Sequence, residues 1–165
     1  YEADESSISG IKKETHYLPS KTIILPDCLS GSAGKGKFYI YNNRYFSSLY
    51  PLKPEQTGAY SFDSQFGWDT DPKALSIVET LTLDTVTLDE VVKREKSENI
   101  PSPDFLSLDT QGSELEILKG GEFAIRNTVV AIATEVSFTQ IYQDQPLFGE
   151  IIDCLLYKSP SPRDS

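Results

Sequence analysis

The segment Asp104-Phe-Leu-Ser-Leu-Asp-Thr-Gln-Gly-Ser-Glu-Leu-Glu-Ile-Leu-Lys-Gly-Gly121 carries the clearest structural signal in this chain of 165 residues. Asp104 to Leu108 is a short apolar run that predicts a buried strand, and Asp109 ends it. Gly112 to Lys119 carries leucines at helical spacing, and Gly120 follows at the position of a helix C-terminal cap. A strand that leads directly into a helix indicates an α/β domain.

Strand and helix patterns alternate on both sides of this stretch. Runs rich in β-branched and aromatic residues predict strands, and apolar residues at helical spacing predict helices. The predicted strands are Thr22 to Leu25, Lys37 to Tyr41, Ile77 to Thr85 and Val129 to Val136, and the predicted helices are Glu5 to Thr15, Leu88 to about Lys96 and Pro146 to Leu156. The alternation predicts a largely parallel sheet, in which the apolar run at Val129 to Val136 would be covered on both faces.

Two connecting segments carry signals of their own. Thr87 and Glu90 stand three positions apart ahead of an apolar run, which predicts a capping box with Thr87 as the N-cap. Asn42 to Lys73 is rich in aromatic residues, glycine and proline and keeps no sustained period. We expect this segment to be a loop insertion that lines a pocket.

The composition restricts the class of partner. The chain has 25 acidic and 15 basic residues and a net charge of −10 at pH 7, which opposes binding to nucleic acid or anionic lipid. No apolar run approaches the roughly 18 residues of a membrane span. The chain has two cysteines, Cys28 and Cys154, too few for a disulfide framework or a thiolate metal cluster. We therefore expect a soluble protein of the reducing cytoplasm.

Acidic residues stand where predicted strands end. Ligands of an open α/β sheet bind outside the carboxyl ends of its strands, so Asp109 and Glu135 are candidate site residues. Neighbouring parallel strands would bring these two side chains within several ångströms of each other. Glu2 is placed to end a further strand. Glu114 lies in the first turn of the helix after Asp109, where a stabilising charge and a functional role are both open.

The central stretch resembles the signature of the FkbM-type methyltransferases, whose pattern runs Leu-Lys-Ile-Asp-Val-Glu-Gly-x-Glu-x-x-x-Leu-x-Gly. The similarity extends over nearly all of Tyr1 to Asp153. Further similar segments are Tyr1 to Asp4, Asp27 to Gly31, Ser47 to Tyr50, Thr85 to Glu90, Thr134 to Phe138 with Tyr142, and Pro146 to Phe148. The resemblance implies a Rossmann-like class I methyltransferase fold with a mostly parallel sheet, and S-adenosylmethionine as the cofactor.

The resemblance also implies roles for individual residues. Glu2 would bind the ribose hydroxyls of the cofactor, and Cys28 and Leu29 would lie against its adenine. Asp109 would stand at the methyl-transfer end of the site. The acceptor would be surrounded by Gln111, Glu114 and Glu135.

Methyl transfer requires the nucleophile, the methyl group and the sulfur to be in line. With a hydroxyl acceptor, it also benefits from a group that takes the hydroxyl proton. We expect O-methylation of a sugar or another small hydroxyl compound, with Asp109 as the first candidate for the base and Glu135 as the second. Ser107 replaces the family's lysine two positions before the aspartate, and Gln111 replaces its glutamate two positions after. Gln111 therefore has no role as a base. Because a positive and a negative charge are both absent, the direction of the pKa shifts of the neighbouring carboxylates is not predicted.

Both ends of the chain predict an incomplete domain. The family's glycine-rich turn would precede Tyr1 and its last two strands would follow Asp153. We expect a partial methyltransferase domain over residues 1–153 that binds the cofactor poorly and is inactive alone. Residues 154–165 resemble a translated sequencing adapter, with an authentic Ser/Pro-rich tail as the alternative, and we expect no function there.

Several patterns point to other functions. Gly31 to Lys37 is close to a phosphate-binding loop, but Phe38 stands where a magnesium-binding Ser or Thr belongs and a strand follows, which indicates a turn. Asp69-Thr-Asp71 is typical of metal-dependent glycosyltransferases and also of ordinary turns. His16 and Cys28 have no evident catalytic partner. A glycosyltransferase that uses a sugar nucleotide and a metal, or a non-catalytic remnant of the fold, is the alternative.

Overall fold

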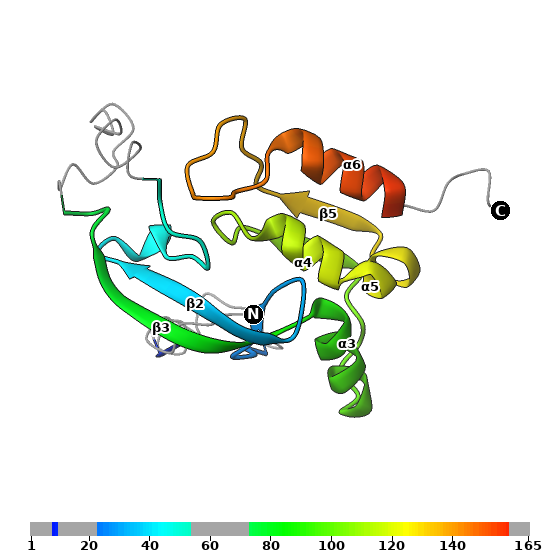
Figure 1. The fold of residues 1–165 in the computed structure, drawn as a ribbon. Helices are drawn as coiled ribbons and strands as arrows, with labels where there is room; N and C mark the ends of the chain where they lie inside the picture. Colours follow the sequence, from blue (N-terminus) through cyan, green and yellow to red (C-terminus); the bar gives the residue numbers. More distant parts are fainter. Residues whose placement is uncertain (1–7, 10–22, 54–72, 159–165) are drawn as a thin grey trace.

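The computed structural model describes residues 8–9, 23–53 and 73–158, which form a mixed α/β structure (Figure 1). Its elements are β1 (Cys28–Leu29), β2 (Gly34–Tyr41), η2 (Arg44–Phe46), β3 (Ile77–Val86), α3 (Leu88–Ser97), β4 (Phe105–Leu108), α4 (Glu114–Gly120), α5 (Glu122–Asn127), β5 (Ala131–Thr134) and α6 (Phe148–Lys158). The predicted order of strands and helices from β2 to α6 is confirmed. The short helix α5 was not predicted.

The strands form two sheets where a single, mostly parallel one was expected. The first sheet has the order β1-β3-β2, with β1 parallel and β2 antiparallel to β3, and the second is the parallel pair β4-β5. The longest ladder is therefore antiparallel. Consecutive strands pair in this way without a crossover helix, and Phe38 faces Leu81 across the ladder as a cross-strand apolar pair.

Two predicted strands differ from the observed ones. Residues 23–27 form no strand, and β1 begins instead at Cys28, since Pro26 lacks the N–H that a ladder requires. The predicted strand from Val129 to Val136 is reduced to the four residues of β5. Ala131 and Ala133 of β5 are exposed, so β5 is not covered on both faces. Of the predicted helix at Glu5 to Thr15, the described residues 8–9 are helical and the others lie outside the described part.

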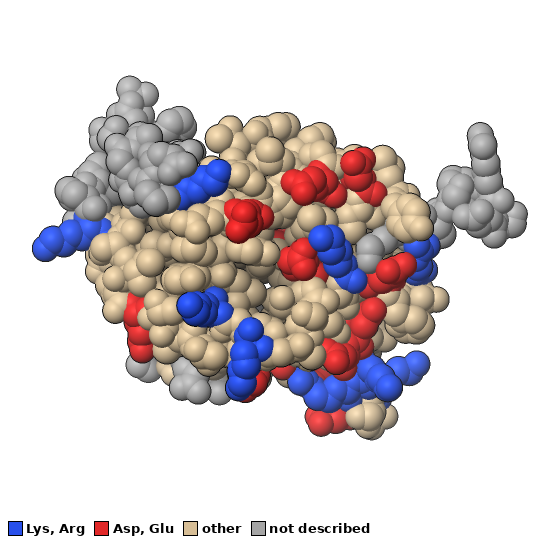
Figure 2. All heavy atoms as spheres, viewed as in Figure 1, with Lys and Arg blue, Asp and Glu red and all other residues tan. Residues whose placement is uncertain are grey.

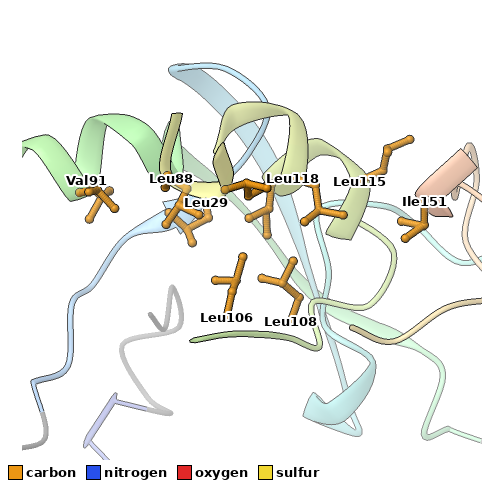
Figure 3. Close-up of a cluster of buried hydrophobic side chains, with 12 residues drawn as sticks. Leu29, Leu88, Val91, Leu106, Leu108, Leu115, Leu118 and Ile151 are labelled. Atoms are coloured by element: carbon orange, nitrogen blue, oxygen red, sulfur yellow. The ribbon is translucent and has the colours of Figure 1, made fainter. Parts of the chain in front are cut away.

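The main apolar core lies around β4 and is formed with β1 and the four helices α3 to α6. Leu106 and Leu108 point from β4 toward Leu115 and Leu118 of α4 (Figure 3). The buried members of the core are Leu29, Leu88, Val91, Val92, Leu106, Leu108, Leu115, Ile117, Leu118, Ala124, Ile125 and Ile151. They come from β1, α3, β4, α4, α5 and α6, so this core fixes the position of the loop at the end of β4.

The predicted capping box at the start of α3 is confirmed. The Thr87 hydroxyl accepts from the backbone N–H of Glu90 at 3.1 Å, and the Glu90 carboxylate accepts from the backbone N–H of Thr87 at 2.9 Å. Asp89, which lies between Thr87 and Leu88 on one side and Glu90 on the other, caps a second helix. The Asp89 carboxylate accepts from the backbone N–H groups of Phe123 and Ala124 at the start of α5, both at 2.9 Å. Asp89 thus satisfies donors that a helix N-terminus leaves without a partner.

Replacing Asp89 with alanine is expected to lower the free energy of unfolding by about 1–2 kcal/mol, because two N–H groups of α5 lose their acceptor. Urea denaturation followed by circular dichroism measures the loss. Asp84→Ala is the matched control, since Asp84 makes an exposed ion pair with Lys35 and such pairs contribute about 1 kcal/mol at most. Equal losses in the two variants would show that Asp89 does not cap α5.

Charged side chains of both signs are interspersed on the face shown in Figure 2. Among residues 8–9, 23–53 and 73–158, no helix has the length and the apolar character needed to cross a membrane.

Candidate active site

The parallel pairing of β4 with β5 places Asp109 beside Glu135. Leu108 pairs with Thr134, and the backbone N–H of Glu135 donates to the carbonyl of Leu108 at 3.0 Å. The side-chain nitrogen Nε2 of Gln111 donates to Asp109 Oδ1 at 2.8 Å and to Glu135 Oε2 at 3.3 Å. The expected proximity of Asp109 and Glu135 is therefore confirmed, and we refer to these two residues as the carboxylate pair.

Gln111 bridges the carboxylate pair. Its amide nitrogen has two hydrogens, and its contacts with Asp109 and Glu135 use both. Its Oε1 accepts from the hydroxyl of Tyr142 at 3.0 Å, and its backbone carbonyl accepts from the hydroxyl of Ser48 at 2.7 Å. Because its polar side-chain atoms are engaged within the protein, the geometry favours a bridging role over the acceptor-binding role implied by the sequence resemblance.

Glu114 shapes the loop between β4 and α4. Gln111 and Gly112 have φ angles of 56° and 107°, in the left-handed region that favours glycine. Glu114 is 4% exposed, and its carboxylate accepts from the backbone N–H groups of Thr110 at 2.8 Å and Gly112 at 3.0 Å. A negative charge is also favoured at the N-terminus of a helix such as α4. These contacts give Glu114 a structural role in holding Gln111 in place.

The segment 46–53 packs against this loop. Ser48 is 1% exposed and donates its hydroxyl to the loop carbonyl described above. Leu52 forms an isolated antiparallel bridge with Tyr142, which lies between β5 and α6. The two residues belong to a second apolar cluster, which consists of Tyr41, Leu52 and Tyr142 with Tyr39, Phe46, Tyr50, Leu75 and Ile141 around them. The start of the predicted insertion thus lies beside the site, while residues 54–72 lie outside the described part.

Gln145 holds the backbone around Tyr142. Its Oε1 accepts from the backbone N–H groups of Ile141 at 2.8 Å and Tyr142 at 3.2 Å, and its Nε2 donates to Ser137 Oγ at 2.9 Å. Sequence reasoning gave no role to Gln145, Tyr142 or Ser48. The available signal was that Tyr142 and Ser48 fall in segments similar to the FkbM family, but it did not show what they contact.

The surroundings of the carboxylate pair favour a bound proton near neutral pH. The pKa of Glu135 is raised to about 7, although part of its side chain is exposed. Loss of water is the largest cause, and the hydrogen bond with Asp109 and the charges of Asp109 and Glu114 act in the same direction. Burial is also the largest cause that raises the pKa of Tyr142. Its hydroxyl therefore stays protonated and remains a hydrogen-bond donor to Gln111.

The candidate adenine-binding residues, Cys28 and Leu29, lie near the C-terminal end of α4. Cys28 and Leu29 form β1 and are 6% and 8% exposed, and burial raises the pKa of the Cys28 thiol to about 11. A Cβ atom added to Gly120, the last residue of α4, would lie 2.5 Å from the carbonyl oxygen of Ser30. Helix α4 begins at Glu114, beside the loop that carries Gln111, and ends at Gly120, beside the residue that follows β1. Glu2 lies outside the described residues.

The other sequence patterns add no second site to the described residues. Gly31 to Lys37 runs into β2, which begins at Gly34, as expected for a turn followed by a strand. Lys35 forms an ion pair with Asp84 on β3. His16 and the segment Asp69-Thr-Asp71 lie outside the described residues. Within the described part, no group of three or more His, Cys, Asp and Glu side chains is arranged to hold a metal ion.

The fold is thus that of an α/β protein with a carboxylate pair at the carboxyl ends of two parallel strands, which is the edge of a sheet where ligands of α/β proteins commonly bind. The family model described as Methyltransferase FkbM domain matches residues 18–159. The chain therefore belongs to the FkbM methyltransferase domain family, as the motif at Asp104 to Gly121 indicated. No curated protein and no solved structure matches the chain.

Proposed function

We propose that the protein transfers a methyl group from S-adenosylmethionine to a hydroxyl group of a sugar or another small molecule. The observation that carries the proposal is the carboxylate pair bridged by Gln111 at the ends of β4 and β5. Family membership supports methyl transfer as the reaction class. A Rossmann-like arrangement of the sheet, with β4 and β5 as two of its parallel strands, is part of the proposal.

The charge of the site suits this cofactor. S-adenosylmethionine, when bound, supplies an electrophilic methyl group on a positively charged sulfur. Asp109 would lie at that end of the cofactor, because a carboxylate stabilises a nearby cation. Glu2 would hold the ribose, and Cys28 and Leu29 the adenine, as the family resemblance implies. Leu29 is buried in the main core and Cys28 is buried beside it, so contact would be made along the edge of β1.

Glu135 is suited to take the proton of the acceptor hydroxyl. A general base works best when its pKa lies near the working pH, and the pKa of Glu135 is raised to about 7. Asp109, the first candidate from the sequence, would then keep the pair's other negative charge beside the reacting group. Gln111 would hold the two carboxylates at a fixed separation through its amide hydrogens.

The acidic balance of the chain supports a small-molecule or glycan acceptor over nucleic acid or an anionic membrane, because a net charge of −10 repels polyanions. A cytoplasmic location is part of the same proposal. The glycosyltransferase alternative rests on Asp69 and Asp71, which lie outside the described residues, and no contact in the described part favours it.

Methyl transfer from radiolabelled S-adenosylmethionine tests the proposal, with a panel of sugars and small hydroxyl compounds as acceptors. We expect labelled methyl ether on at least one hydroxyl acceptor, and saturable binding of S-adenosylmethionine by calorimetry. Binding of a sugar nucleotide that requires a divalent metal, without binding of S-adenosylmethionine, would support the glycosyltransferase instead. Binding of neither ligand would leave the non-catalytic remnant.

A further inference from the structure

The hydroxyl of Tyr142 lies within hydrogen-bond distance of two acceptor oxygens but has only one hydrogen to donate. Its hydroxyl lies 3.0 Å from Oε1 of Gln111 and 3.1 Å from the backbone carbonyl of Phe46. A phenol has a single O–H, so it donates to one of these oxygens at a time. The residue is 1% exposed, which keeps water from replacing either contact. The direction of this one hydrogen therefore matters for the orientation of the Gln111 amide.

We propose that Tyr142 is a positioning residue that keeps the Gln111 amide oriented with its nitrogen toward Asp109 and Glu135. While the Tyr142 hydroxyl donates to Oε1, only Nε2 faces the carboxylate pair, and it donates to both members. If the amide turned over, Oε1 would face two carboxylates and would repel them. Nε2 would then donate to the Tyr142 oxygen, and the hydroxyl hydrogen would be left for Phe46.

The two orientations differ in what the carboxylate pair requires. With Nε2 toward the pair, both carboxylates receive a hydrogen bond in their charged form, which favours loss of the proton. With Oε1 toward the pair, one carboxyl must stay protonated in order to donate a hydrogen bond to it. Tyr142 thus acts through Gln111 to keep the pair able to accept a proton, since the tyrosine hydroxyl lies against Gln111 and the carbonyl of Phe46.

Tyr142 is held firmly enough for this task. The backbone N–H groups of Ile141 and Tyr142 donate to Oε1 of Gln145, and Leu52 forms a bridge with Tyr142 from the other side. The Gln111 carbonyl is fixed separately by Ser48. The backbone on both sides of the Tyr142–Gln111 contact is therefore tied down, so loss of the hydroxyl alone changes the amide and not the loop.

Tyr142→Phe tests the proposal in the 165-residue chain without cofactor. We expect the apparent pKa of the carboxylate pair, followed by carboxyl carbon NMR, to rise by about one pH unit, because the charged form loses hydrogen bonds. A rise of that size would lower the deprotonated fraction at pH 7 from about one half to about one tenth. The charged groups that act on Glu135 are Asp109 and Glu114, and both are unchanged in this variant. Tyr142 is uncharged at this pH, so its replacement by phenylalanine adds and removes no charge.

Two further variants give the test its specificity. Tyr50→Phe removes a hydroxyl from another ring of the same cluster and should leave the titration unchanged. Gln111→Met removes the amide and should itself raise the apparent pKa, and Tyr142→Phe should add nothing in that background if it acts through Gln111. An unchanged titration in Tyr142→Phe, or an equal rise with and without Gln111, would overturn the proposal.

The unmodified chain gives a second measurement that does not depend on the folding of a variant. The side-chain amide hydrogens of Gln111 should shift in NMR with the same apparent pKa as the carboxyl carbons, and hydrogens that do not follow the titration would also overturn the proposal. Only the kinetic consequence rests on the proposed function. In the active protein, Tyr142→Phe should move the rise of kcat with pH to higher pH values. A titration that shifts while no methyl transfer is found would reject the proposed function and keep this inference.

Discussion

Replacing Glu114 with alanine is expected to lower the free energy of unfolding by about 3 kcal/mol or more, because buried N–H groups lose a charged acceptor. The carboxylate of this 4% exposed residue binds the backbone of Thr110 and Gly112, and also the hydroxyl of Thr110 at 3.1 Å. Alanine leaves these donors in a region with little access to water. Urea denaturation of the purified variant measures the loss.

The same substitution should also disturb the carboxylate pair. Gln111 lies between Thr110 and Gly112 with a φ angle of 56°, a conformation that a non-glycine residue keeps only when its surroundings impose it. Without Glu114 the loop is free to relax, and the Gln111 bridge between Asp109 and Glu135 should be lost. Methyl transfer by the proposed enzyme should then fall together with stability.

Glu116→Ala is the matched control for Glu114→Ala. Glu116 lies on the same helix, is more exposed, and pairs with Lys119 at 2.9 Å, three positions further along. Surface pairs of this kind contribute at most about 1 kcal/mol, so this variant should remain close to the unmodified protein. If both substitutions cost the same, the buried contacts of Glu114 would not be what holds the loop, and its assignment as a structural residue would be wrong.

The parts of the fold that local chemistry controls could be predicted from the sequence. The capping box at Thr87 and Glu90 depends on residues three positions apart, and both of its hydrogen bonds are present. The proximity of Asp109 and Glu135 follows from two short apolar runs that pair in parallel, because parallel pairing places the residues after both strands at one edge.

The parts that depend on distant contacts could not be predicted. Ser48 and Gln111 are 63 positions apart, and Tyr142 and Gln111 are 31 apart, so no periodicity links them. The antiparallel ladder of β2 and β3 and the short helix α5 carry equally weak signals. The bridging role of Gln111 is the clearest case. A glutamine in place of the family's glutamate indicated only a lost charge, while the structure shows an amide that donates to two acids.

Glu135→Gln is expected to lower kcat for methyl transfer by a factor of about 10² to 10³, because the amide keeps the size of the carboxyl but accepts no proton. For the unmodified enzyme, kcat should rise with pH and level off above about 7, the pKa to which burial and Asp109 raise Glu135. The variant should lose this rise. Initial rates over pH 5 to 9 at saturating cofactor measure both effects. If Asp109→Asn removes the rise while Glu135→Gln keeps it, the base is Asp109.

The stability of the same variant should change in the opposite direction. A carboxyl whose pKa is higher in the folded protein than in the unfolded chain binds more protons when folded, so its contribution to stability is complete below the unfolded pKa of 4.5 and is lost as the pH rises through about 7. At pH 8 the charged Glu135 beside Asp109 therefore disfavours folding. Glutamine removes that charge, so Glu135→Gln should have a higher Tm than the unmodified protein at pH 8, and the difference should be smaller at pH 5.

A rise in stability with a loss of activity is the result that separates a catalytic carboxylate from a structural one. Glu98→Gln, which changes an exposed carboxylate after α3, should alter neither Tm nor kcat. A structural role for Glu135 would instead lower Tm at both pH values and reduce kcat through loss of the fold. Proteins commonly keep like charges close together only where activity needs them. A lower Tm at pH 8 would therefore remove Glu135 from the proposed mechanism.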